Sequence, residues 1–259
     1  KKRLYMTATP RLYGESSKIK ASKIDCVLCS MDDEALYGKE FFHVGFSYAV
    51  ENGLLTDYKV LVLTVSEADL PANIREDAEN KDKELNFDDA TRLVGVINGL
   101  SKIIKGDNGI TWQTDPRMMR RGLVFCSQIR PSKKSSRLND SIGSVDFAAA
   151  MPVISQRYNE ELSEEEQKKV VHITSKHIDG SMNAQDRDTI LSWLKEEADD
   201  PQECRLVSNV RCLSEGVDVP ALDAVVFLSP RNSQVDIVQS VGRVMRSFHK
   251  GLPDEKKYG

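Results

Sequence analysis

Short apolar runs separated by helical patterns fill the second half of the chain. The runs lie at residues 122–126, 170–174, 204–208 and 224–228. Continuous apolar runs of this length are typical of strands that are buried on both faces. Helical periodicity lies between and after them, at residues 143–160, 184–197 and 234–247. The resulting order of elements predicts an α/β fold in which helices cover both faces of a parallel sheet.

The first half has a less regular pattern. Apolar, β-branched stretches predict strands at residues 1–10, 24–30 and 58–65, and residues 39–52 are a predicted helix that ends at Gly53. Four apolar residues recur at helical spacing within residues 88–105, namely Leu93, Ile97, Leu100 and Ile104. This stretch is therefore an amphipathic helix with Asn86 or Asp88 as its cap. In the predicted helix 143–160, Pro152 is expected to cause a kink or a break.

The last predicted helix, 234–247, has a polar face. At 100° per residue, Gln239, Arg243 and Arg246 fall within an arc of about 60°. Ser233 and Asp236 have the spacing of a capping box, so the helix should begin just after Ser233. Two arginines on a helix anchored by its other face suit bidentate contact with a carboxylate or a phosphate.

Polar residues and glycines follow the predicted strands. Ligands of open parallel sheets bind at the carboxyl ends of the strands. The residues at these positions are Ser127 and Gln128, His177 and Gly180, Asn209, and Asp218. We therefore expect a binding site along this edge of the sheet.

Composition and charge narrow the classes of function. The 259-residue chain is 40% hydrophobic and 29% charged, with a formal net charge of −4, so any nucleic-acid contact must come from local patches. Two basic clusters, Arg117/Arg120/Arg121 and Lys133/Lys134/Arg137, are either solvated surface or part of a nucleic-acid groove. No apolar run is long enough to span a membrane.

Cysteine usage indicates a reducing, cytoplasmic environment. The five cysteines are odd in number and lie mostly in apolar runs. Cys26 and Cys29 form an isolated CxxC pair, which we interpret as buried strand cysteines rather than as a metal or redox site. No metal-binding residues are predicted in this chain.

Five motifs, in order, resemble those of superfamily 2 helicases and translocases. They are TATP at residues 7–10 (motif III), LVFCSQ at 123–128 (motif IV), HIDGSM at 177–182 with Arg187, EGVDVP at 215–220 (motif V) and QSVGRVMR at 239–246 (motif VI). Each motif alone is a weak signal, but together they extend over nearly the whole chain. Their sequences are similar to those of predicted bacterial helicases and of the motor subunits of type III and type I-like restriction enzymes.

The resemblance implies that ATP binds between two RecA-like lobes, with motifs IV to VI in the second lobe. Arg246 would be the arginine finger on the γ-phosphate and Arg243 its neighbour on the phosphates. Gln239, Gly216 and Asp218 would complete this side of the nucleotide site. Such an arginine neutralises the charge of the transition state during phosphoryl transfer.

The resemblance also implies a nucleic-acid track and a link between the two sites. The backbone of the nucleic acid would contact motif IV, the HxG turn and the approach to motif V. The candidate residues are Ser127, Gln128, His177, Gly180, Asn209 and Arg211. Thr7 and Thr9 would couple the track to ATP hydrolysis.

The sequence lacks two motifs that ATP hydrolysis needs. No GxxxxGK[ST] phosphate-binding loop and no acidic Walker B quartet occurs in it. In the family both belong to the first lobe. We therefore expect residues 1–57 to be the end of the first lobe with the linker, and residues 58–259 to be the second lobe. Alone, such a chain would neither hydrolyse ATP nor bind it tightly, whereas the full-length protein would use ATP and Mg²⁺.

Three functions remain open on the sequence alone. The leading one is the C-terminal motor lobe of an ATP-dependent DNA helicase or translocase in a restriction or defence system. The second is a nucleic-acid-binding or protein-interaction module without catalysis. The third, which the wording of motifs V and VI favours less, is a lobe of an RNA helicase.

Overall fold

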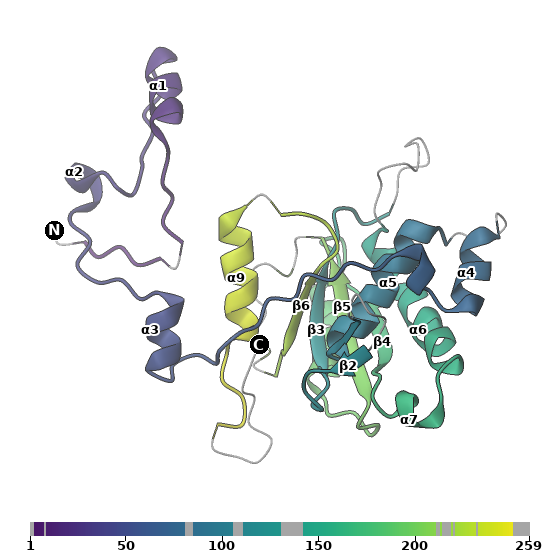
Figure 1. Ribbon diagram of the computed structural model, residues 1–259. Helices are drawn as coiled ribbons and strands as arrows, with labels where there is room; N and C mark the ends of the chain where they lie inside the picture. The colour runs from purple at the N-terminus through teal and green to yellow at the C-terminus, as the bar shows by residue number, and fades with distance from the viewer. Residues whose placement is uncertain are drawn as a thin grey trace. The chain divides into compact units, whose positions relative to one another are not determined.

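The computed structural model describes residues 3–7, 9–80, 85–105, 111–130, 142–210, 213, 219, 221–231 and 233–250. Contacts divide the chain into two units, residues 1–53 and residues 54–259. The first unit contains α1 (Glu15–Lys23), α2 (Glu34–Tyr37) and α3 (Phe46–Glu51). The elements of the second unit, labelled in part in Figure 1, are η1 (Glu67–Asp69), α4 (Ala72–Glu79), α5 (Phe87–Leu100), β1 (Ile103–Lys105), β2 (Thr111–Gln113), β3 (Arg121–Phe125), α6 (Ser144–Glu160), α7 (Glu164–Gln167), β4 (His172–His177), α8 (Ala184–Lys195), β5 (Glu203–Asn209), β6 (Ala224–Phe227) and α9 (Gln234–Val244).

Four parallel strands form the sheet of the second unit, in the order β4-β5-β3-β6. In the inner strand β3, Leu123 lies opposite Val207 of β5 and Val225 of β6. Helices α6 and α8 make the crossover connections that parallel pairing requires. The predicted α/β fold with a parallel sheet is confirmed.

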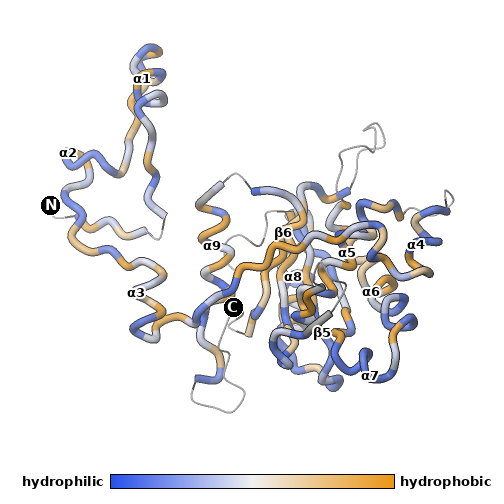
Figure 2. Tube along the Cα trace, viewed as in Figure 1, coloured by the Kyte–Doolittle hydropathy of each residue, from blue (hydrophilic) through white to orange (hydrophobic). Residues whose placement is uncertain are grey.

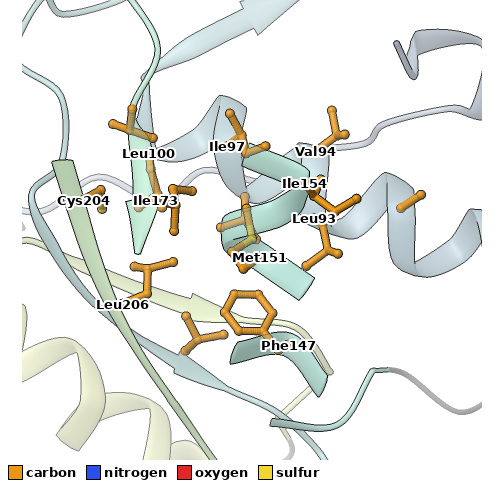
Figure 3. Packing of buried hydrophobic residues seen from close by; sticks show 14 of the residues in the cluster. Leu93, Val94, Ile97, Leu100, Phe147, Met151, Ile154, Ile173, Cys204 and Leu206 are labelled. Atoms are coloured by element: carbon orange, nitrogen blue, oxygen red, sulfur yellow. The ribbon is translucent and has the colours of Figure 1, made fainter. Parts of the chain in front are cut away.

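One face of the sheet packs against α5 and α6. Phe147, Met151 and Ile154 of α6 lie between the strands and Leu93 and Ile97 of α5 (Figure 3). Phe147 and Met151 are fully buried. Burial of a large apolar side chain stabilises the fold by roughly 1.5–3 kcal/mol, so this layer is a main source of the unit's stability.

The opposite face packs against α8 and α9. Leu123 and Phe125 of β3 point to this side, together with Leu194 of α8 and Val244 of α9. Their neighbours Val124 and Cys126 belong to the first face. This alternation follows from the two-residue repeat of a strand, and it explains why the run 122–126 is apolar without interruption.

Helix α6 continues through Pro152, so the predicted break is wrong. A proline in a helix leaves the carbonyl four residues earlier without its usual donor. Here that carbonyl belongs to Ala148, and the Ser175 hydroxyl of β4 donates to it at 2.8 Å. The tertiary hydrogen bond replaces the lost helical one, which makes the proline tolerable.

The predicted strands at 1–10 and 24–30 are wrong. The described residues of the first unit contain helices but no strand, and a strand needs a neighbour to receive its backbone hydrogen bonds. Met6 and Val27 are each 84% exposed. Helix α3 begins at Phe46 rather than at residue 39, and Gly53 follows it with φ +62°, as expected for a residue after a helix end.

Residues 58–65 are extended but form no strand, contrary to the prediction. Leu63 and Val65 lie against α5 where Gly99 and Gly95 leave room: a Cβ at these glycines would lie 2.8 Å from Leu63 Cδ1 and 3.4 Å from Val65 Cγ2. An apolar cleft of about 510 Å³ separates this segment from β6. The segment therefore packs on α5 rather than pairing with the sheet, and it stands out as a hydrophobic stretch in Figure 2.

The predicted helix 88–105 is correct in type but shorter. Asn86 caps α5 by accepting a hydrogen bond from the Asp89 N–H, and the helix ends at Leu100. Lys102 then has φ +57°, a value that interrupts a helix. Ile104 lies instead in β1, which pairs antiparallel with β2. No pattern noted in the sequence predicts this antiparallel strand pair.

Candidate functional site at the carboxyl edge of the sheet

The loop after β3 is held by the first turn of α6. The backbone N–H groups of Ser144 and Val145 donate to the carbonyls of Gln128 and Ile129, at 2.9 and 3.1 Å. Gly143 permits this approach, because a Cβ there would lie 2.6 Å from the Ile129 oxygen. Ser127 is exposed and Gln128 is half-buried. Both predicted site residues therefore lie at the edge of the sheet on a fixed backbone.

The end of β5 is tied to the end of β3 through Asn209. Its carbonyl accepts the Cys126 N–H at 2.8 Å, and its side-chain Nδ2 donates to the Val124 carbonyl at 3.2 Å. Its Oδ1 accepts the Leu213 N–H at 3.4 Å, and the residue is fully buried. Asn209 thus shapes the loops at this edge with its side-chain polar atoms, and its contact with nucleic acid stays a prediction.

The turn after β4 is ordered by Asp179. His177 Nε2 lies 3.0 Å from Asp179 Oδ2, and the Ser181 hydroxyl and backbone N–H donate to Asp179 Oδ1 at 2.5 and 2.7 Å. These donors, the Ser181 hydroxyl foremost and then His177, lower the pKa of Asp179 to about 2. Gly180 is exposed, and a Cβ there would meet no atom within 4 Å. The backbone of the turn is therefore accessible at Gly180, and the hydrogen bonds of Asp179 hold the turn in place.

Replacing Ser181 with alanine is expected to raise the pKa of Asp179 towards its ordinary value of 3.8. A carboxyl with a lowered folded-state pKa stabilises the fold above its unfolded pKa, and this contribution disappears as the pH falls from about 4 to about 2. The variant should therefore be less stable than the unaltered chain at neutral pH. This difference in stability should become smaller as the pH falls. NMR titration of the Asp179 carboxyl measures the shift, with Ser181→Thr as the control that keeps the hydroxyl. An unchanged titration in Ser181→Ala would contradict this account.

The helix with the arginines begins as predicted but ends earlier. The Ser233 side chain accepts the Asp236 N–H at 3.2 Å. Helix α9 ends at Val244, so Arg246 lies beyond it rather than within a helix that extends to residue 247. Gln239 and Arg243, four residues apart on one face, are half-buried, and Arg246 is exposed. Of the two arginines, only Arg246 is exposed to solvent, whereas Arg243 is partly covered.

Thr56 satisfies a backbone carbonyl at the end of α9. Its backbone N–H and its hydroxyl both donate to the Met245 carbonyl, at 2.8 and 3.0 Å. In a longer helix this carbonyl would accept the N–H of His249, which instead has φ +51°. Nothing in the sequence predicts this role of Thr56, because the two residues are 189 positions apart.

The structure brings part of the predicted site together. Because β3, β4 and β5 are parallel, their carboxyl ends place Ser127, Gln128, His177, Gly180 and Asn209 along one edge. Three further predicted residues, Arg211, Gly216 and Asp218, lie outside the described residues. Thr7 and Thr9 belong to the first unit, where the Thr9 N–H donates to Thr7 Oγ1 at 3.1 Å.

The first basic cluster lies at the start of β3 and includes two arginines that donate hydrogen bonds to backbone carbonyls. The Arg121 guanidinium donates to the carbonyls of Leu194 and Glu196 at the end of α8, each at 3.0 Å, where a cation is favoured. Burial lowers the pKa of Arg121. The Arg120 guanidinium donates to the Asp200 carbonyl at 3.3 Å. Both side chains have structural roles. The second cluster, Lys133/Lys134/Arg137, lies outside the described residues.

The cysteines differ from the prediction in one respect. Cys26 and Cys29 are exposed rather than buried in a strand, whereas Cys126 and Cys204 are buried. Burial raises the pKa of the Cys126 thiol to about 12, which makes it unreactive.

Within the described residues, no three His, Cys, Asp or Glu side chains gather as metal ligands would. Nor does any helix in this part of the chain have the length and apolar composition of a membrane span.

Comparisons with known proteins agree with the fold. The family model described as helicase conserved C-terminal domain matches residues 120–248. A solved structure, "ATP-dependent Type ISP restriction-modification enzyme LlaBIII bound to DNA", is similar over the whole of this chain, with 38% identity and a TM-score of 0.74. The chain spans 15% of the length of that enzyme. A comparison with curated proteins finds no match. Residues 120–248 of the chain are therefore a helicase conserved C-terminal domain, in agreement with the resemblance of its motifs to those of superfamily 2.

Proposed function

We propose that this chain is the C-terminal motor lobe of an ATP-dependent DNA helicase or translocase of the restriction-modification type. One observation carries the proposal: a single parallel sheet supports both the loops at its carboxyl edge and helix α9, which leads to the exposed Arg246. The similar Type ISP enzyme is described as ATP-dependent and as bound to DNA, which supports both ligands. We place the activity in the cytoplasm.

In this proposal Arg246 is the arginine finger. Arg246 is an exposed residue, and it follows Met245, whose backbone remains in the helical region (φ −82°, ψ −2°). Gln239 and Arg243 lie on the helix that leads to it. Three donors of this kind fit the oxygens of a triphosphate. ATP with Mg²⁺ supplies the reactive phosphoryl group, and Arg246 stabilises the charge that its oxygens develop.

The sequence offers no phosphate-binding loop, so the proposal assigns the cradle for the β- and γ-phosphates to a first RecA-like lobe. Gly216 and Asp218 would complete the nucleotide side of the second lobe. On this account the 259-residue chain alone does not turn over ATP. Thr7 and Thr9 would transmit nucleic-acid binding to the nucleotide site.

The nucleic-acid track follows the carboxyl edge of the sheet. Ser127 and Gln128 would donate through their side chains, and the open backbone at Gly180 would admit a phosphate closely. His177 orients the turn by its contact with Asp179. Asn209 would act through the loops that it holds, and Arg211 would contact the backbone of the nucleic acid directly.

The test is ATP turnover by the full-length protein with duplex DNA, with RNA, and without nucleic acid, alongside the 259-residue chain. We expect duplex DNA to stimulate turnover strongly, RNA to do so weakly, and the chain alone to be inactive. Stimulation by RNA alone would favour an RNA helicase. DNA binding without any turnover by the full-length protein would favour a non-catalytic binding module. Turnover by the lone chain would contradict the two-lobe account.

A further inference from the structure

Arg231 connects the ends of three strands. It lies in the loop between β6 and α9, three residues before α9 begins at Gln234. Its Nη2 donates to the Cys126 carbonyl at 3.2 Å and to the Val210 carbonyl at 2.9 Å. These carbonyls belong to the residues just after β3 and β5. One guanidinium nitrogen therefore joins the two loops that begin at Cys126 and Val210.

The position of the guanidinium is fixed by aromatic packing. Arg231 Cζ lies 5.3 Å from the centre of the Phe125 ring, and this ring stacks on Phe227 with centroids 5.6 Å apart. Phe125 is buried, so the cation rests on a rigid platform. The Leu228 N–H also donates to the Phe125 carbonyl, at 3.1 Å. The ends of β3, β5 and β6 thus form one connected cluster around Arg231.

The two hydrogen bonds to these carbonyls come from a charged donor. Hydrogen bonds from a charged donor are stronger than those between neutral groups. Without the guanidinium, the Cys126 and Val210 carbonyls would lose the donor that they share. A displacement of either loop must therefore displace Arg231 or break its hydrogen bonds. Arg231 in turn lies on the short segment that leads into α9.

From this geometry we infer that Arg231 is a positioning residue that couples the nucleic-acid track to the arginine helix. When nucleic acid moves the loops after β3 and β5, Arg231 carries that movement to the start of α9 and so to Arg243 and Arg246. Arg231 acts through these groups rather than on the nucleotide. The inference rests on the proposed function, because it needs both a nucleic-acid site and a nucleotide site.

The sequence contains only a faint signal for this role. Arg231 follows Pro230 in the stretch SPRNS, residues 229–233, just before the α9 cap. A single arginine after a proline is compatible with a solvated loop. Only the structure shows that its side chain reaches back to strands that end about 20 and 100 residues earlier.

The test measures coupling in the full-length protein. The affinity for a fluorescein-labelled DNA duplex is determined with and without adenylyl imidodiphosphate, an ATP analogue that is not hydrolysed, and the ratio of the two is the coupling factor. Allosteric coupling is typically about 5- to 150-fold. We expect a factor in this range for the unaltered protein and a factor below about 2 for Arg231→Met, which keeps the apolar stem over Phe125 but removes the donors. Arg231→Lys, with a charge but no planar fork, should give an intermediate factor.

A control and a second variant keep the outcome decisive. Lys168→Met removes an exposed cation between α7 and β4 and should keep the full coupling factor. A uniform loss of folded protein cancels in a ratio measured on one variant, so the factor separates coupling from stability. If Arg231→Met does not fold, Arg231→Lys decides. Full coupling in the variant that folds would overturn the inference alone, whereas absence of DNA-stimulated turnover and of coupling in the unaltered protein would overturn the proposed function and the inference together.

Discussion

Replacing Arg246 with alanine in the full-length protein is expected to reduce ATP turnover by about 1,000-fold or more, while the affinity for duplex DNA stays within about threefold. Arginine fingers contribute about 10³- to 10⁵-fold to phosphoryl transfer because they neutralise charge in the transition state. Arg246 is exposed beyond the end of α9, so its removal leaves no cavity. DNA-stimulated ATP turnover and DNA binding are the two measurements.

Lys168→Ala is the control for this substitution. Lys168 is also a largely exposed cation, with a side chain that is 66% accessible, and it lies between α7 and β4 rather than after α9. Its removal should change turnover by less than about twofold, as for most surface substitutions. Near-normal turnover in Arg246→Ala, or equal losses in both variants, would exclude the arginine-finger role.

Replacing Phe147 with alanine is expected to lower the free energy of unfolding of the chain by about 3–5 kcal/mol. The Phe147 ring is fully buried between α6 and the sheet (Figure 3). Its removal loses apolar burial and leaves a cavity that a close-packed layer cannot fill. Urea denaturation of the 259-residue chain, followed by circular dichroism, measures the change.

Val153→Ala, on the same helix, is the control for Phe147→Ala. Val153 is 57% exposed, and alanine has a higher helix propensity than valine. The free energy of unfolding should therefore change by less than about 0.5 kcal/mol. A loss below about 1 kcal/mol in Phe147→Ala, or similar losses in both variants, would show that the α6 layer is not the core that we describe.

Local patterns predicted the second unit well. The continuous apolar run of β3 indicated a strand covered on both faces, and Leu123 and Val124 do face opposite helical layers. Asn86 caps α5 and Ser233 caps α9 as the sequence indicated. In these cases the signal lies within a few residues of the element, which is why the sequence alone suffices.

Two of the wrong predictions failed because of distant partners. Pro152 does not break α6, because Ser175 of another element donates to the freed carbonyl of Ala148. Residues 58–65 have a strand-like composition, yet Gly95 and Gly99 offer them a place on α5 instead. No local pattern reveals such partners, and β propensity in particular depends on what lies beside the strand.

The candidate site divides in the same way. Motif spacing indicated Ser127, Gln128 and Gly180, and the parallel sheet places them along one edge. Spacing could not show that the Asn209 side chain is occupied by backbone groups. Nor could it show that Thr56 holds the end of α9. The sequence thus predicted which residues lie along this edge of the sheet, whereas their hydrogen-bond partners required the structure. Their roles in binding stay predictions.

The most direct measurement of the central claim is a structure of the full-length protein with adenylyl imidodiphosphate, Mg²⁺ and duplex DNA. We predict that the Arg246 guanidinium lies within about 3 Å of a γ-phosphate oxygen, the distance of a charge-assisted hydrogen bond, while the DNA backbone follows the loops after β3 and β4. An Arg246 side chain directed away from the nucleotide, or DNA bound at the opposite edge of the sheet, would contradict the account.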